Sequence, residues 1–100
     1  MSIANVAEEG PWIKVYDENN KRISQMGSRN VTVVGIASEF FVTEEGPWIK
    51  TYDETCKRIA QMSSSNVEVQ GAVGDTFSTK EGPWIKTYNQ HCKRISQRNA

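Results

Sequence analysis

Three tryptophans that recur at a fixed interval are the residues of this sequence best suited to binding chemistry. Trp12, Trp48 and Trp84 stand 36 residues apart, and each is followed five residues later by a side chain that can accept hydrogen bonds. Those acceptors are Asp17, Asp53 and Asn89. A flat indole ring beside hydrogen-bond acceptors is the usual chemistry of a sugar-binding platform. These six residues are therefore the candidate ligand-binding site.

The same tryptophans have a structural interpretation, which the sequence favours. Aromatic side chains that recur at this rate in a small β domain mostly belong to its core, where they dominate the energetics. The tyrosines two pleats away on the same strand face are expected to be core or inter-sheet residues for the same reason. They are Tyr16, Tyr52 and Tyr88.

Cysteine and histidine provide no convincing catalytic or metal site. Cys56 and Cys92 each precede a lysine, whose charge could favour a reactive thiolate. His91 directly precedes Cys92, however, so the two side chains diverge in a strand or a tight turn. We predict free thiols in solvated turns. One histidine and two cysteines also fall short of the four ligands of structural zinc, so we predict no metal and no cofactor.

Glutamates that precede each Gly-Pro pair could in principle act as an acid and a base. Glu8 and Glu9, Glu44 and Glu45, and Glu81 lie there. Catalytic carboxylate pairs need burial or a neighbour that separates their pKa values, and a turn is expected to provide neither. We therefore predict solvated turn residues and no enzymatic activity.

The tryptophans belong to a block that occurs three times, beginning at Glu9, Glu45 and Glu81 and ending in the second copy at Met62. The first and second copies differ at four positions, and the second and third at five. Repeats with a period of this size are typical of solenoids, propellers and pseudo-symmetric β folds. We predict one domain over residues 1–100, with repeats at approximately 2–37, 38–73 and 74–100, the third incomplete.

Each repeat indicates short antiparallel strands joined by tight turns, so we predict an all-β fold. Strand A (2–9, 38–45 and 74–81) ends at Gly-Pro, and strand B begins at the tryptophan. Strand C returns after a polar turn, and strand D (31–36 and 67–72) is absent from the third copy. From the alternation of side chains along a strand, we expect burial of Ile13, Ile49, Ile59 and Trp48, with Lys50 exposed or extended toward solvent.

Part of the third repeat resembles a blade of a β-propeller. The residues are Gly74-Asp75-Thr76-Phe77-Ser78-Thr79, then Trp84-Ile85-Lys86-Thr87-Tyr88-Asn89, then Lys93-Arg94-Ile95. The resemblance implies four-stranded blades arranged around an axis. Small lectins that resemble propellers assemble several chains of two or three blades, so two copies of this chain would give six blades. The alternative is a closed pseudo-threefold monomer, similar to a barrel, a prism or a trefoil.

Charge and hydropathy limit the classes of partner that this sequence is expected to bind. Twelve basic and twelve acidic residues cancel and are interleaved, so we expect no nucleic acid and no membrane as partners. The sequence has no apolar run of the roughly 20 residues that a spanning helix needs, and its start lacks the features of a signal peptide. We expect a cytoplasmic protein.

Two functions fit these observations. The first is a non-enzymatic binding module that presents equivalent sites to a carbohydrate or a protein. The alternative is a structural, self-assembling repeat protein. Because open sheet edges favour association, we also expect a homo-oligomer, with a dimer as the simplest form.

Overall fold

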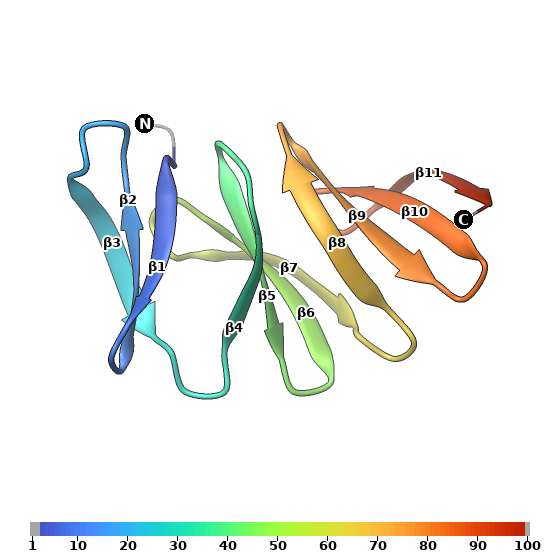
Figure 1. The fold of residues 1–100 in the computed structure, drawn as a ribbon, viewed down its shortest axis with the longest axis horizontal. Helices are drawn as coiled ribbons and strands as arrows, with labels where there is room; N and C mark the ends of the chain where they lie inside the picture. Colours follow the sequence, from blue (N-terminus) through green and yellow to red (C-terminus); the bar gives the residue numbers. More distant parts are fainter. Residues whose placement is uncertain (1–2, 100) are drawn as a thin grey trace.

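The computed structural model describes residues 3–99, which form antiparallel strands and no helix (Figure 1). The all-β prediction is confirmed. Within this range no helix is long and apolar enough to cross a membrane. Met1, Ser2 and Ala100 lie outside the described residues, so part of the strand expected over 2–9 cannot be compared. The strands are β1 (Asn5–Glu9), β2 (Trp12–Tyr16), β3 (Arg22–Gly27), β4 (Thr32–Ile36), β5 (Phe40–Glu45), β6 (Trp48–Asp53), β7 (Arg58–Ser63), β8 (Glu68–Val73), β9 (Thr76–Glu81), β10 (Trp84–Asn89) and β11 (Arg94–Asn99).

The strands form three sheets, each a simple antiparallel meander. Sheet 1 has the order β1-β2-β3, sheet 2 the order β4-β5-β6-β7, and sheet 3 the order β8-β9-β10-β11. Figure 1 shows the three sheets in a row, with sheet 1 and sheet 3 at opposite ends. Within the described residues they form an open arrangement of three separate sheets.

The grouping of strand D differs from the sequence prediction. Strand D of one repeat pairs with strand A of the next repeat, so the three-stranded sheet is the first and the third sheet has four strands. The cause lies in the connections. The segments 28–31 and 64–67 each contain an asparagine at positive φ, Asn30 (60°) and Asn66 (59°), which redirects the chain after strand C. Strand D then folds back on strand A through a short hairpin.

Two-residue Gly-Pro turns fix the register between strands A and B. Gly10, Gly46 and Gly82 have φ of 60°, 59° and 62°. Positive φ at the first central residue is what a type II′ hairpin turn requires. The residues that flank each turn are direct cross-strand partners, so the glutamate before the turn faces the tryptophan after it. All later pairs in each hairpin follow from this register.

The core consists of two clusters between neighbouring sheets. Between sheets 1 and 2, Ile13 and Val15 pack with Phe41 and Tyr52. The rings of Phe41 and Tyr52 stack with centroids 5.4 Å apart. The burial expected for Ile13 and for Tyr52 is confirmed, because Ile13 is fully buried and Tyr52 nearly so.

The second cluster repeats this arrangement between sheets 2 and 3. Val42 and the fully buried Ile49 pack with Phe77 and Tyr88, whose rings also stack at 5.4 Å. Ile59 is half-buried and packs against this cluster, so its expected burial is only partial. Sheet 2 therefore lies between its neighbours, with one face packed on sheet 1 and the other face packed on sheet 3.

A hydroxyl group also joins each pair of sheets. In sheet 1, Ser24 Oγ donates to the carbonyl oxygen of Glu54 in the B–C turn of sheet 2, at 2.6 Å. In sheet 2, Thr51 Oγ1 donates to the carbonyl oxygen of Gln90 in the B–C turn of sheet 3, at 2.7 Å. The donor comes from strand C in the first case and from strand B in the second, but the acceptors are equivalent. This contact fixes where one sheet lies on the next.

Candidate ligand-binding edge

The three A–B turns and both C–D connections lie along one edge of the molecule, which is the lower edge in Figure 1. We call this the Gly-Pro edge and define it by residues 10–12, 28–31, 46–48, 64–67 and 82–84. Backbone hydrogen bonds hold the connections to the turns. Ser28 N donates to Pro11 O at 3.0 Å, and Ser64 N donates to Pro47 O at 2.9 Å. The edge is therefore built from hydrogen-bonded turns.

All three tryptophans lie at this edge and are exposed. The exposed fraction is 43% for Trp12, 42% for Trp48 and 38% for Trp84. The preference for core packing, and with it the predicted burial of Trp48, is wrong. Side chains alternate along strand B, and each indole projects on the same face as the tyrosine of its strand. In sheets 2 and 3 this face packs on the preceding sheet. Each tryptophan is the first residue of its strand, however, and lies beyond the apolar clusters.

The aspartates and asparagine expected beside the tryptophans lie at the opposite edge. Trp48 is the first residue of β6 and Asp53 is the last. At the rise of an extended strand, their Cα atoms are roughly 17 Å apart. Asp53 Oδ1 accepts hydrogen bonds from the backbone N–H groups of Thr55 (2.9 Å) and Lys57 (3.0 Å). Asp53 thus caps the B–C turn, and the structure does not bring it to the indole.

The equivalent residues have the same capping role. Asp17 Oδ1 accepts from the N–H groups of Asn19 and Lys21, both at 2.9 Å. Asn89 Oδ1 accepts from the N–H groups of the residues two and four positions later, at 2.9 and 3.1 Å. Asp17 is buried. These three side chains stabilise turns at the edge that lies away from the tryptophans.

The acceptor beside each indole is instead a glutamate, which the sequence analysis placed in a solvated turn. Trp48 has Glu45 as its cross-strand partner on β5 and Ser63 on β7. Direct partners project on the same face of a sheet. The sequence signal was available, because a two-residue turn makes the residues before and after it direct neighbours. The equivalent rows are Glu9-Trp12-Gly27 and Glu81-Trp84-Asn99.

Glu45 is the centre of a hydrogen-bond network. Its Oε2 accepts from the Tyr52 hydroxyl at 2.6 Å and from the Thr43 hydroxyl at 2.7 Å, and its Oε1 lies 3.2 Å from Nζ of the half-buried Lys50. Burial opposes ionisation of Glu45, but these donors outweigh it and lower its pKa. Burial, together with the bond to Glu45, raises the pKa of Tyr52. The side chain of Glu45 is only 15% exposed, so the solvated-turn prediction is wrong for it.

Sheet 3 repeats the network in full. Glu81 accepts from Tyr88 at 2.6 Å and Thr79 at 2.7 Å and lies 3.1 Å from Lys86 Nζ. Burial opposes ionisation of Glu81, but the same three donors outweigh it and lower its pKa. Burial and the bond to Glu81 raise the pKa of Tyr88 to about 12.

Sheet 1 has a looser version. Glu9 accepts from Tyr16 at 2.6 Å and lies 3.5 Å from Lys14 Nζ, but Ala7 occupies the position of the threonine. The Glu9 side chain is 43% exposed. Here the hydrogen bond from Tyr16 is the main cause of the lowered pKa of Glu9. This carboxylate is the most accessible of the three.

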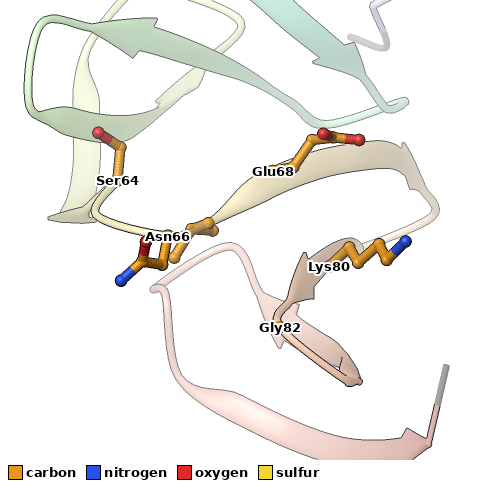
Figure 2. Close-up of a pocket in the computed structure, with 6 residues that line it drawn as sticks. Ser64, Asn66, Glu68, Lys80 and Gly82 are labelled. Carbon is orange, nitrogen blue, oxygen red and sulfur yellow. The ribbon is translucent and has the colours of Figure 1, made fainter.

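A shallow hollow of about 390 Å³ opens on the Gly-Pro edge where sheet 3 joins the preceding connection. Figure 2 shows Ser64 and Asn66 on the connection and Lys80 and Gly82 on the β9–β10 hairpin. Glu68 and Lys80 are cross-strand partners on its wall, so the lining carries both signs of charge. In sheet 2 the corresponding pair is Thr32 and Glu44, which makes this pairing of opposite charges particular to sheet 3.

The cysteines are free and half-buried, with φ of 62° at Cys56 and 60° at Cys92. Their placement in solvated turns is therefore wrong, because each B–C turn packs on the preceding sheet. Burial raises the pKa of both thiols, so the neighbouring lysines do not activate them. Within residues 3–99, His, Cys, Asp and Glu side chains do not gather into a group of three that could hold a metal ion.

The fold and this edge define an all-β protein of three antiparallel sheets that pack face to face and carry a row of exposed tryptophans. Comparison of the sequence with protein-family models and with curated proteins finds no match.

Proposed function

We propose that this protein is a non-enzymatic binding module whose three tryptophans form equivalent contact sites for a carbohydrate chain. The observation that carries the proposal is the exposure of Trp12, Trp48 and Trp84 at the same place on the same edge of successive sheets. Indole rings with one face available contact the apolar faces of sugar rings, and neighbouring polar groups orient the hydroxyls.

The surroundings of each indole support a carbohydrate over an apolar ligand. Glu45 and Ser63 flank Trp48 on the same face, and Lys50 lies one pleat further along β6. Carboxylate, hydroxyl and ammonium groups together supply both acceptors and donors. Backbone pairing and hydrogen-bonded turns hold these groups in place, so little ordering entropy is lost on binding.

Spacing favours a polymer over a single sugar. Face-to-face sheets pack roughly 10 Å apart, so neighbouring tryptophans are separated by about that distance or more. A chain of several sugar rings can span this separation and contact two sites at once. Linked weak contacts then give an avidity above the affinity of either site.

A glycan array probed with fluorescently labelled protein tests the proposal. We expect signal on a set of oligosaccharides, stronger for longer chains of the same sugar. The matched variants are Trp48→Ala, the triple variant in which all three tryptophans become alanine, and Lys57→Ala at the opposite edge. The expected result is a stepwise loss from the single to the triple variant and no change in Lys57→Ala.

Two outcomes contradict the proposal. One is an array without signal above background for the unmodified protein. The other is binding that persists in the triple tryptophan variant while its circular dichroism spectrum shows that the fold is retained.

We propose self-association as a second function, because the outer face of sheet 3 retains part of an inter-sheet contact. Thr87 and Ser96 occupy the positions whose hydroxyls bond the next sheet in sheets 1 and 2, and the nearby Ile95 is 57% exposed. Polar residues replace apolar ones elsewhere on this face, with Ser78 where sheet 2 has Val42. Association through it is therefore weaker than packing between sheets of one chain.

Light scattering across a concentration series tests this second proposal. We expect the dimer mass to appear at tens of micromolar and to decrease in Ile95→Lys. A mass of 11.3 kDa at all concentrations would contradict it.

A further inference from the structure

The hollow on the Gly-Pro edge lies between the turns that precede two of the tryptophans (Figure 2). On one side lies Ser64, whose backbone N–H donates to the carbonyl oxygen of Pro47, directly before Trp48. On the other side lies Gly82, which shortly precedes Trp84. The volume of about 390 Å³ falls within the roughly 300–1,000 Å³ that is usual for small-ligand sites. The hollow can therefore hold part of a ligand that reaches from one tryptophan to the next.

The uncharged lining of this hollow is repeated in the chain, whereas its charged lining is not. Four of the six lining residues have identical equivalents 36 residues earlier, between sheets 1 and 2. These four are Ser64, Asn66, Val67 and Gly82. The other two, Glu68 and Lys80, stand where the earlier copy has Thr32 and Glu44. The two places thus share their uncharged residues, and the charge at the position of Lys80 is reversed.

The ammonium group of Lys80 is available to a ligand. Lys80 has no ion pair within residues 3–99, whereas the lysine one pleat beyond each tryptophan is paired with a glutamate. Its cross-strand partner Glu68 instead accepts a hydrogen bond from the Gln70 side chain at 2.9 Å, and Figure 2 shows the two charged groups apart from each other. The position is open to solvent even where a further sheet follows, because the equivalent Glu44 is exposed although sheet 3 packs on sheet 2.

We propose, building on the carbohydrate-binding function above, that the hollow is the subsite for an acidic sugar residue of the bound chain. Lys80 pairs with an anionic substituent of that sugar, a carboxylate or a sulfate, and Glu68 accepts hydrogen bonds from its hydroxyl groups. The Ser64 hydroxyl and the Asn66 amide add further donors and acceptors. At the equivalent place Glu44 repels the same substituent, so an acidic sugar selects one of the two inter-sheet positions and fixes where the chain lies along the tryptophans.

A glycan array that contains paired oligosaccharides tests this subsite. The two members of a pair differ in one group only, either a carboxylate against its methyl ester or a sulfate against the free hydroxyl. We expect the unmodified protein to prefer the anionic member by about twofold to fivefold, as for a single exposed ion pair. The kind of pair that shows the preference identifies which of the two anions Lys80 binds.

Matched variants locate the preference on the protein. Lys80→Ala and Lys57→Ala each remove one positive charge from an exposed position, the first in the hollow and the second at the opposite edge. We expect the preference for anionic members to disappear in Lys80→Ala and to persist in Lys57→Ala. Glu44→Lys places a lysine at the equivalent position and should increase the preference, because a second ammonium group then becomes available to the chain.

Two results would overturn this subsite while the carbohydrate-binding function stands. One is equal binding of both members of every pair, with binding lost in the triple tryptophan variant. The other is a preference that remains in a folded Lys80→Ala variant or falls equally in Lys57→Ala, since general charge attraction would then be its cause. An array without signal for any glycan contradicts the carbohydrate-binding function itself, and the subsite with it.

Discussion

The hydrogen bond from Tyr52 to Glu45 gives the most quantitative prediction about stability. Tyr52→Phe removes the hydroxyl and keeps the ring that stacks on Phe41. The bond is 2.6 Å long, and its acceptor is an ionised carboxylate that is only 15% exposed. Hydrogen bonds to charged groups contribute about 1.5–3 kcal/mol. We therefore expect the free energy of unfolding to fall by about that amount, since water cannot readily replace the lost donor.

Sheet 1 contains a matched control for this experiment. Tyr16→Phe removes a bond of the same length, but the acceptor Glu9 is 43% exposed and lies on the outer face of sheet 1. Its loss of stability is expected to be clearly smaller. Both variants are compared with the parent protein by urea unfolding, followed by circular dichroism because the tryptophans are exposed and report their own surroundings.

A double-mutant cycle with Glu45→Gln isolates the pairwise interaction. The expected coupling between Tyr52 and Glu45 lies within the roughly 0.5–3 kcal/mol seen for residues in direct contact. Equal losses in Tyr16→Phe and Tyr52→Phe, or a coupling near zero, would refute the reasoning that burial sets the strength of this bond.

Three further predictions concern the core, pH and the thiols. Ile49→Ala is expected to lower the free energy of unfolding in urea by about 2–5 kcal/mol, because the side chain is fully buried. A loss below about 1 kcal/mol would contradict this. The pKa values of Glu45 and Glu81 are lower in the folded state. The stabilisation that these two carboxylates contribute should thus be complete above the unfolded-state pKa of about 4.5. It should decline as pH falls through the lower pKa values of the folded state. In Glu45→Gln, which has lost one of the two carboxylates, the decline of stability with falling pH should be smaller. The pKa of Tyr88 is raised to about 12, so its stabilisation should decline as pH rises from 10 through that value. Finally, both thiols should react with Ellman's reagent in unfolded, unreduced protein and more slowly in the folded state, whereas fewer than two reactive thiols would indicate a disulfide.

The strands and their pairing within each hairpin could be predicted from the sequence because the signals are local. Gly46-Pro47 defines a two-residue turn, and the alternation from Trp48 to Tyr52 defines the strand that follows. The cap of the turn after strand B is also local, since Asp53 accepts hydrogen bonds from the N–H groups two and four positions later. None of these features depends on another sheet.

The arrangement of the sheets could not be predicted in the same way. Strand D can pair with strand C before it or strand A after it, and the repeat period is the same in both cases. The exposure of Trp48 depends on where the neighbouring sheet ends, and the burial of Cys56 depends on the sheet onto which its turn packs. Such contacts join residues far apart in the chain, and the order of residues within one repeat does not encode them.

The differences among the repeats bear on why the tryptophans are retained. The hairpin Glu-Gly-Pro-Trp-Ile-Lys is identical in all three copies, although its glycine, proline and tryptophan are exposed. Strand A, which contributes to the core, differs in every copy, and one position holds Val6, Val42 and Ser78. Recent duplication alone would leave differences without regard to burial. Packing alone would constrain the buried positions more than the exposed ones. The turn accounts for the constant glycine and proline, and the hydrogen-bond network accounts for the constant glutamate and lysine. The exposed tryptophan belongs to neither, so a surface role of the kind we propose accounts for its constancy better than packing does.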